Sequence, residues 1–187
     1  MRTKPQDDDH VGFSGWRLLG LGFWQAWWMI SMCTDVLLPT TDRFPFAGNT
    51  TLWVLVLTTV GYLVVVALAR RLSPFLTHRA SFLAAGGLTA AGTVTLPIAL
   101  TLGSGAAGFA WFLAGTVSLS LGNALLLIMW GELWSALATG RVGRHLYVSY
   151  TFAFVLFFVA YALPEAAAVA FTAALPIVSA AVLVACK

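Results

Sequence analysis

The side chains that could carry out chemistry are few in this sequence, and their spacing forms no catalytic set. The segment GFSG at residues 12–15 fits the GxSG pattern of intramembrane serine proteases, but Ser14 precedes the first hydrophobic stretch. The three histidines, His10, His78 and His145, all lie in the predicted tail or in predicted loops, so no histidine base is expected beside that serine within the membrane. The sequence has neither a Walker-type phosphate loop nor an HExxH zinc motif. We therefore predict no catalytic residues, no bound metal and no cofactor.

Two acidic residues lie at the ends of hydrophobic stretches, where an ionisable group is either functional or simply hydrated. Asp35 lies near the predicted outer end of the first stretch, as a hydrated cap or as part of a binding site. Glu132 lies at the predicted inner end of the fourth stretch. Its structural interpretation is an ion pair with Arg141 or Arg144, worth at most about 1 kcal/mol if exposed. Its functional alternative is a proton-coupling group.

Two carboxamides, Gln25 and Asn123, lie deep within hydrophobic stretches. Facing lipid would leave their hydrogen-bonding groups unsatisfied, so both should face other helices. Each either joins helices through a hydrogen bond, typically worth about 0.6 kcal/mol in a membrane, or lines a small-molecule site. The tryptophans near Gln25 are equally open to packing or ligand binding. The candidate ligand-binding residues are Gln25, Trp28, Asp35 and Asn123.

The composition indicates that membrane-spanning helices position these side chains. Of the 187 residues, 60% are hydrophobic and only 9% are charged, and the mean hydropathy is +0.89. An ordinary soluble domain has about a quarter of its residues charged, so this chain cannot cover a water-facing surface and lipid must be its main solvent. The net charge of +3 is too small to suggest nucleic-acid binding.

Six hydrophobic stretches within residues 18–186 are long enough to cross a hydrocarbon core of about 30 Å, which takes about 20 residues of helix. Residues 1–17 form an N-terminal tail. We predict an all-α membrane protein with six transmembrane helices. The stretches are Leu18–Leu38, Thr50–Ala69, Ala80–Leu100, Ala107–Trp130, Leu146–Leu163 and Ala166–Cys186.

The distribution of lysine and arginine predicts the orientation, because cytoplasmic loops carry an excess of both. With the N terminus inside, all ten lysines and arginines except Arg43 fall on the inner side. We therefore predict a multi-pass protein of the bacterial cytoplasmic (inner) membrane, with the tail and both termini in the cytoplasm.

Small residues indicate where the helices pack. Gly108, Gly115 and Gly122 recur every seven residues in the fourth stretch and so share one face. Because lipid tails are as apolar as leucine, close backbone approach must hold such a bundle together. We predict that this face packs closely on another helix, with a role in motion between helices as the alternative.

Two segments are alike and suggest an internal repeat. TVTLPI at residues 93–98 and TAALPI at residues 172–177 both read T-x-x-L-P-I, in the third and sixth stretches. Three helices followed by three of opposite topology form the inverted repeat of many transporter halves. A 3+3 inverted repeat and a chance match in a biased composition both remain open.

The six stretches, with an arginine-rich loop between the second and third, resemble one half of a major facilitator transporter. That loop, residues 69–79, has the basic residues of the superfamily's G-x-x-x-D-R-x-G-R-[RK] pattern but lacks its glycine–aspartate core. The segments ARRLSP (69–74), GNALLLIMWGELW (122–134) and LPIVS (175–179) together resemble the membrane-embedded N-terminal region of bacterial LuxR-type regulators. In that family a facilitator-like bundle of two six-helix halves precedes a cytoplasmic helix-turn-helix domain.

The resemblance covers about residues 17–186 and the first six-helix half only. It implies a sensory or regulatory membrane module that binds a small ligand or partner helices, without catalysis. We expect no DNA-binding domain and no direct nucleic-acid contact from this chain. The expected partners are the lipid bilayer and either a second six-helix half or a homodimer partner. The alternatives are a half-size transporter that acts as a dimer and a gene fragment without activity.

Overall fold

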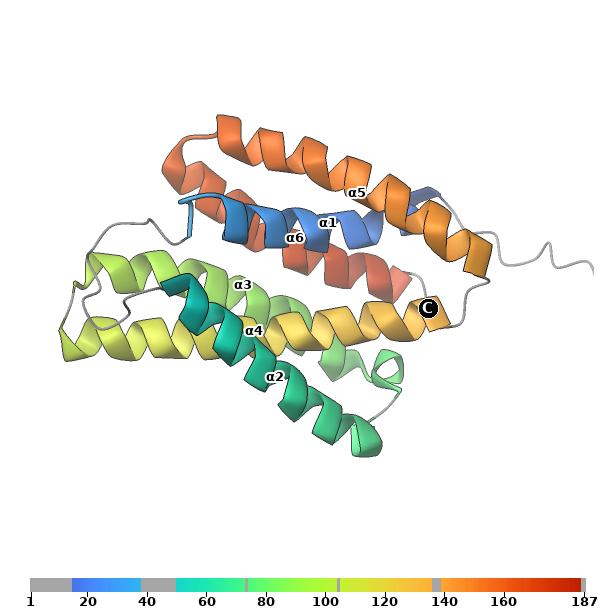
Figure 1. Ribbon diagram of the computed structural model, residues 1–187, viewed down its shortest axis with the longest axis horizontal. Helices are drawn as coiled ribbons and strands as arrows, with labels where there is room; N and C mark the ends of the chain where they lie inside the picture. Colours follow the sequence, from blue (N-terminus) through green and yellow to red (C-terminus); the bar gives the residue numbers. More distant parts are fainter. Residues whose placement is uncertain (1–14, 38–49, 73, 104, 136–138, 186–187) are drawn as a thin grey trace, which may run out of the picture.

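The computed structural model describes residues 15–37, 50–72, 74–103, 105–135 and 139–185. These residues form six α-helices and one short 3-10 turn, without a β-strand among them (Figure 1). The prediction of an all-α protein is therefore confirmed. The elements are α1 (Gly15–Cys33), α2 (Thr50–Leu72), η1 (Phe75–Thr77), α3 (Arg79–Thr101), α4 (Ala106–Ser135), α5 (Thr139–Ala162) and α6 (Glu165–Ala185).

Five helices, α2 to α6, are long and apolar enough to cross a membrane. The chain is therefore a multi-pass membrane protein by helix length and hydropathy. The exception is α1, whose 19 residues include four tryptophans, Arg17 and Gln25, which lower its hydropathy. At 1.5 Å per residue α1 is still about 28 Å long, and it lies alongside α5 and α6 (Figure 1). A sixth span remains a prediction.

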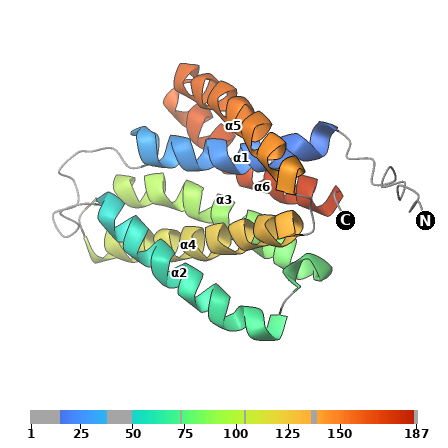
Figure 2. The same cartoon turned by 45° about the vertical axis from the view of Figure 1, so that its right-hand side comes forward.

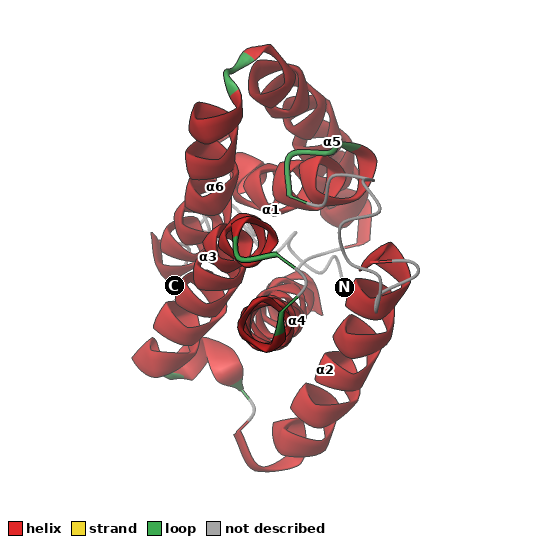
Figure 3. Cartoon of the chain, turned by 90° about the vertical axis from the view of Figure 1, so that its left-hand side faces the viewer, coloured by secondary structure: helices red, strands yellow, loops and turns green. Residues whose placement is uncertain are grey.

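The helices form two groups that meet in the middle of the bundle. α1 packs on α5 and α6, α4 packs on α2 and α3, and α3 packs on α6. α2 and α5 lie on the flanks, each packed mainly on one helix (Figures 2 and 3). Exchanging α1 with α4, α2 with α5 and α3 with α6 leaves this set of pairings unchanged. The pair α1–α5 becomes α4–α2, and the pair α1–α6 becomes α4–α3.

The closest packing joins α3 to α4 through glycines. A Cβ atom on Gly115 would lie 3.1 Å from Cβ and Cγ2 of Thr95, and one on Gly122 would collide with the backbone nitrogen of Thr89. A Cβ on Gly108 would lie 3.3 Å from the carbonyl oxygen of Ala99 on α3 and would collide with that of Gly103, just after α3. All three glycines that recur every seven residues therefore face α3, and their missing side chains allow the two backbones to approach.

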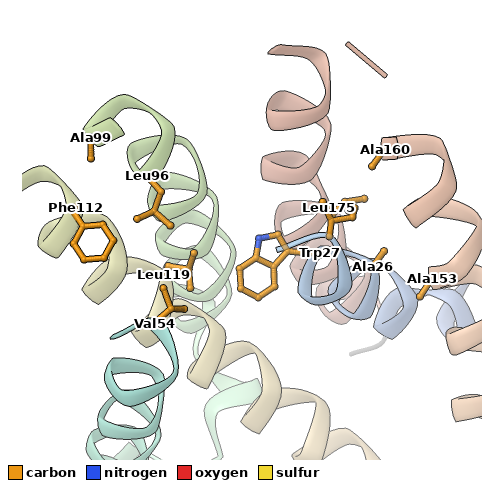
Figure 4. Packing of buried hydrophobic residues seen from close by; sticks show 11 residues of the cluster. Ala26, Trp27, Val54, Leu96, Ala99, Phe112, Leu119, Ala153, Ala160 and Leu175 are labelled. Atoms are coloured by element: carbon orange, nitrogen blue, oxygen red, sulfur yellow. The ribbon is translucent and has the colours of Figure 1, made fainter. Parts of the chain in front are cut away.

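Two buried clusters fill the bundle, and each contains a fully buried tryptophan. Trp27 lies between Leu96 and Leu119 on one side and Leu175 on the other (Figure 4). The second cluster includes Trp130 and Phe75, the first residue of η1. Because Trp27 belongs to α1, this helix contributes to the interior although it is the one described α-helix that does not meet the hydropathy criterion for a membrane span.

One end of the bundle carries exposed arginines and is called the basic end below. Arg71 lies at the end of α2, Arg79 at the start of α3 and Arg144 in the first turns of α5, and all three side chains are exposed. The start of α1 and the end of α6 lie at the same end (Figures 1 and 2). The α5–α6 turn lies at the opposite end.

Candidate functional site

A hydrogen-bonded chain of side chains joins α1, α4 and α2 in the interior. Trp24 donates from Nε1 to Oδ1 of Asn123 over 2.8 Å, and Asn123 donates from Nδ2 to the hydroxyl of Tyr62 over 3.3 Å. Asn123 is fully buried. Both ends of its carboxamide therefore have partners on other helices. This arrangement corresponds to the structural alternative for Asn123, in which it joins helices, and not to ligand binding.

Other buried polar groups join helices in the same way. Trp27 donates from Nε1 to Thr93 Oγ1 over 2.9 Å, which ties α1 to α3. Trp130 donates from Nε1 to Ser179 Oγ over 3.1 Å, and Ser179 donates to the carbonyl oxygen of Gly20 over 2.9 Å, which ties α4 to α6 and α1. These contacts satisfy donors inside the bundle and contribute about 0.6 kcal/mol each.

Gln25 and Trp28 lie beside this network. Gln25 is only 4% exposed, and its Oε1 has no hydrogen-bond partner among the described residues. The Trp28 ring stacks on Trp24, with centroids 6.5 Å apart and planes at 18°. Trp28 therefore forms an aromatic stack within α1. Its stacking partner, Trp24, is the residue that hydrogen-bonds to Asn123.

Glu132 joins the basic end of α4 to the connection between α2 and α3. Its Oε1 accepts a hydrogen bond from the backbone nitrogen of Phe75 over 3.0 Å, and its Oε2 accepts one from Leu76 over 3.1 Å. The carboxylate therefore caps η1 and holds Phe75 in the second buried cluster.

The predicted pairing of Glu132 with Arg141 or Arg144 stays a prediction. Arg144 is exposed on α5, and the Arg141 side chain lies outside the described ones. The backbone donors were not foreseen, because a backbone amide has no signature in the sequence. Pro74, which precedes η1, was the one local sign of a turn.

The placement of His145 corrects one sequence prediction. His145 was expected in a loop, but α5 begins at Thr139 and not at Leu146, so His145 is helical and fully buried. Its ring lies 5.9 Å from that of Trp130 and 6.5 Å from that of Trp134. The prediction was wrong because hydropathy locates only the apolar part of a helix, whereas α5 continues through a basic segment beyond it.

Of the other two histidines and the GxSG serine, only His78 lies within the described residues. His78 is exposed next to η1, whereas His10 and Ser14 lie outside the described residues. The absence of a catalytic set remains a prediction for the whole chain.

An open pocket of about 850 Å³ lies at the end opposite the basic end. It is formed where α1 ends, α5 ends and α6 begins. Its volume falls within the range of small-molecule sites, which is about 300–1,000 Å³. Its lining includes apolar, aromatic and acidic side chains, namely those of Met32, Asp35, Phe157, Phe158, Tyr161 and Glu165.

The structure does not bring the predicted ligand-binding residues into one site. Asp35 lines the pocket, whereas Gln25, Trp28 and Asn123 do not. The aromatic wall from α5 was missed, because nothing in the sequence states that α5 packs on α1. Only the phenylalanines and tyrosines of the fifth hydrophobic stretch hinted at it.

Comparisons of the chain with sequence models of protein families, with curated proteins and with solved structures find no match.

Proposed function

We propose that this chain is a membrane-embedded sensory or regulatory module that binds a small ligand in the pocket between α1, α5 and α6. The pocket carries the proposal, because it combines a suitable volume with apolar, aromatic and acidic side chains. In the proposed orientation the basic end faces the cytoplasm of a bacterium and the pocket faces outward. The exposed Arg71, Arg79 and Arg144 at one end support this orientation.

The proposed architecture is a major-facilitator-like half bundle of six spans with a 3+3 inverted repeat, as the LuxR-type resemblance implies. Two observations support the repeat. The helix pairings are unchanged when the first three helices are exchanged for the last three. Thr93 and Thr172, the first residues of the two matching segments, are both fully buried and both donate to the carbonyl four residues earlier.

The hydrogen bonds that the deep polar groups make between helices favour a signalling role over transport. Asn123, Thr93 and Ser179 make hydrogen bonds to other helices, so they act as joints of the bundle. The pocket in turn borders α1, whose Gly20 lies against Trp130 and Val182 near the other end. If a ligand displaced α1, the movement would therefore be transmitted to α4 and α6 near the basic end.

This coupling can be tested with a tethered ligand mimic. Cys33 is exposed and lines the pocket. In a Cys186→Ser background, a bulky maleimide attached to Cys33 should change hydrogen exchange at the Phe75 and Leu76 amides, which Glu132 holds at the basic end.

The matched control places the same adduct outside the pocket. Val155 is exposed on α5 and is not part of the pocket lining. A Val155→Cys variant without the native cysteines should leave exchange at Phe75 and Leu76 unchanged. Equal exchange with and without the Cys33 adduct would contradict a sensory role for the pocket.

A half-size transporter that acts as a dimer is the second candidate. It is favoured by the flanking positions of α2 and α5, whose outward faces a second copy would cover (Figure 3). Leu63 on α2 is 65% exposed. Disulfide cross-linking of a Leu63→Cys variant into dimers, together with solute uptake by proteoliposomes, would favour the transporter. A gene fragment without activity predicts neither result.

A further inference from the structure

We infer that the pocket takes an amphipathic organic cation, a ligand with an apolar or aromatic body and a positively charged centre. The inference rests on the proposed function, since it names the chemical class of the ligand for the same pocket. Three features of the lining carry it, namely its charge, its aromatic wall and its limited supply of metal ligands.

The charged side chains among the described lining residues are both acidic. Asp35 is exposed just beyond the end of α1, and Glu165 is exposed in the first turn of α6. Among the residues that the structure describes, no lysine, arginine or histidine lines this pocket. The amino end of α6 offsets part of the Glu165 charge. Next to a low-dielectric membrane interior, such charges favour a cation and disfavour an anion.

The aromatic side chains come from the last turns of α5. Phe157 and Phe158 meet edge to face, with ring centroids 5.7 Å apart and planes at 81°. Phe158 is 65% exposed and Tyr161 is 77% exposed, so the described part of the chain leaves both rings largely uncovered. The face of an aromatic ring attracts an organic cation, and such rings recognise quaternary ammonium groups in proteins.

An inorganic divalent cation fits this lining less well. Calcium takes six to eight oxygen ligands and magnesium an octahedral set. The described residues contain no group of three or more His, Cys, Asp or Glu side chains placed to hold a metal. Two carboxylates beside a wall of rings instead match a large, weakly hydrated cation whose body displaces water from the apolar lining.

The test uses two ions of nearly equal size and shape but opposite charge, tetraphenylphosphonium and tetraphenylborate. The full chain with Cys186→Ser is placed in lipid nanodiscs. The rate at which a small, membrane-impermeant maleimide modifies Cys33 then reports whether the pocket is occupied. Each variant is compared with itself, with and without the ion, so that differences in intrinsic Cys33 reactivity between variants cancel.

Tetraphenylphosphonium should slow Cys33 modification, and tetraphenylborate should not. Asp35→Asn should weaken the protection by up to about fivefold, as expected for one partly exposed charge pair, and Glu165→Gln should weaken it less. Phe158→Leu should weaken it too. Phe154→Leu is the matched control, because Phe154 is exposed on α5 without lining the pocket.

The other outcomes overturn the inference in distinguishable ways. Equal protection by both ions, or protection by the borate alone, would leave a ligand pocket but refute the cationic class. Protection that persists in the Asp35→Asn, Glu165→Gln double variant would also refute it. Protection by neither ion would remove the inference, and the hydrogen-exchange experiment with the Cys33 adduct would still decide the sensory role separately.

Discussion

At the scale of single residues, the carboxylate of Glu132 is the contact with the largest expected effect on the basic end. It accepts hydrogen bonds from Phe75 and Leu76 with separate oxygens, so it replaces the water that would otherwise bind both amides. Hydrogen bonds to a charged group contribute about 1.5–3 kcal/mol, against about 1 kcal/mol for neutral ones. The side chain is half-buried, which reduces these values.

Glu132→Gln should therefore lower the free energy of unfolding by about 1 kcal/mol, because one acceptor is kept and the charge is lost. Glu132→Leu should cost about 2 kcal/mol or more, because both amides lose their partner. Thermal unfolding in detergent measures the cost, and hydrogen exchange at Phe75 and Leu76 locates it. Glu165→Gln is the control at the other end. Unchanged exchange in Glu132→Leu would show that the carboxylate does not hold η1.

Asn123 gives a second prediction at this scale. Asn123→Leu removes the acceptor of Trp24 and the donor to Tyr62, so we expect a loss of about 1 kcal/mol, near the sum of two such bonds in membranes. Thr59→Val is the control, since Thr59 is exposed and, among the described residues, its hydroxyl donates to Leu55 of the same helix. If Asn123→Leu were as stable as Thr59→Val, the residue would be free for ligand binding.

At the scale of elements, hydropathy predicts where helices lie better than where they begin. The predicted stretch Thr50–Ala69 matches α2 closely, because apolar residues fill that helix to its basic end. The start of α5 was missed, because Arg141 and Arg144 end the apolar stretch without ending the helix. Contacts between helices far apart in sequence, such as α1 with α5, leave no pattern in one sequence, so the pocket was not predictable.

Substitutions at two glycines of α4 measure the effect of helix packing separately from that of helix propensity. Gly122→Ala should destabilise by about 1–3 kcal/mol, because its Cβ would collide with the Thr89 backbone on α3. Gly131→Ala, on the same helix, meets nothing within 4 Å and should stabilise by up to about 1 kcal/mol. Thermal unfolding of the two variants in the same detergent compares them. Similar shifts for both would mean that α3 and α4 are not in close contact at Gly122.

At the scale of the whole molecule, the two cysteines report the topology. Cys33 ends α1 and Cys186 follows α6, so the five helices that meet the membrane criterion separate them. An odd number of spans puts the two thiols on opposite sides of the membrane. In intact cells an impermeant maleimide should modify Cys33 and spare Cys186 until the cells are permeabilised. Modification of Cys186 alone would invert the orientation, and modification of both would reduce the number of spans.

Whether α1 crosses the membrane needs a thiol before it. In a variant without native cysteines, Ser14→Cys should behave as Cys186 does and react only after permeabilisation, because a sixth span returns the start of α1 to the cytoplasmic side. The physical reason is that α1 is about as long as the hydrocarbon core is thick. Its tryptophans also hydrogen-bond inside the bundle, where they avoid the cost of facing lipid. If Ser14→Cys reacted from outside as fast as Cys33, α1 would lie on the outer face and the bundle would have five spans.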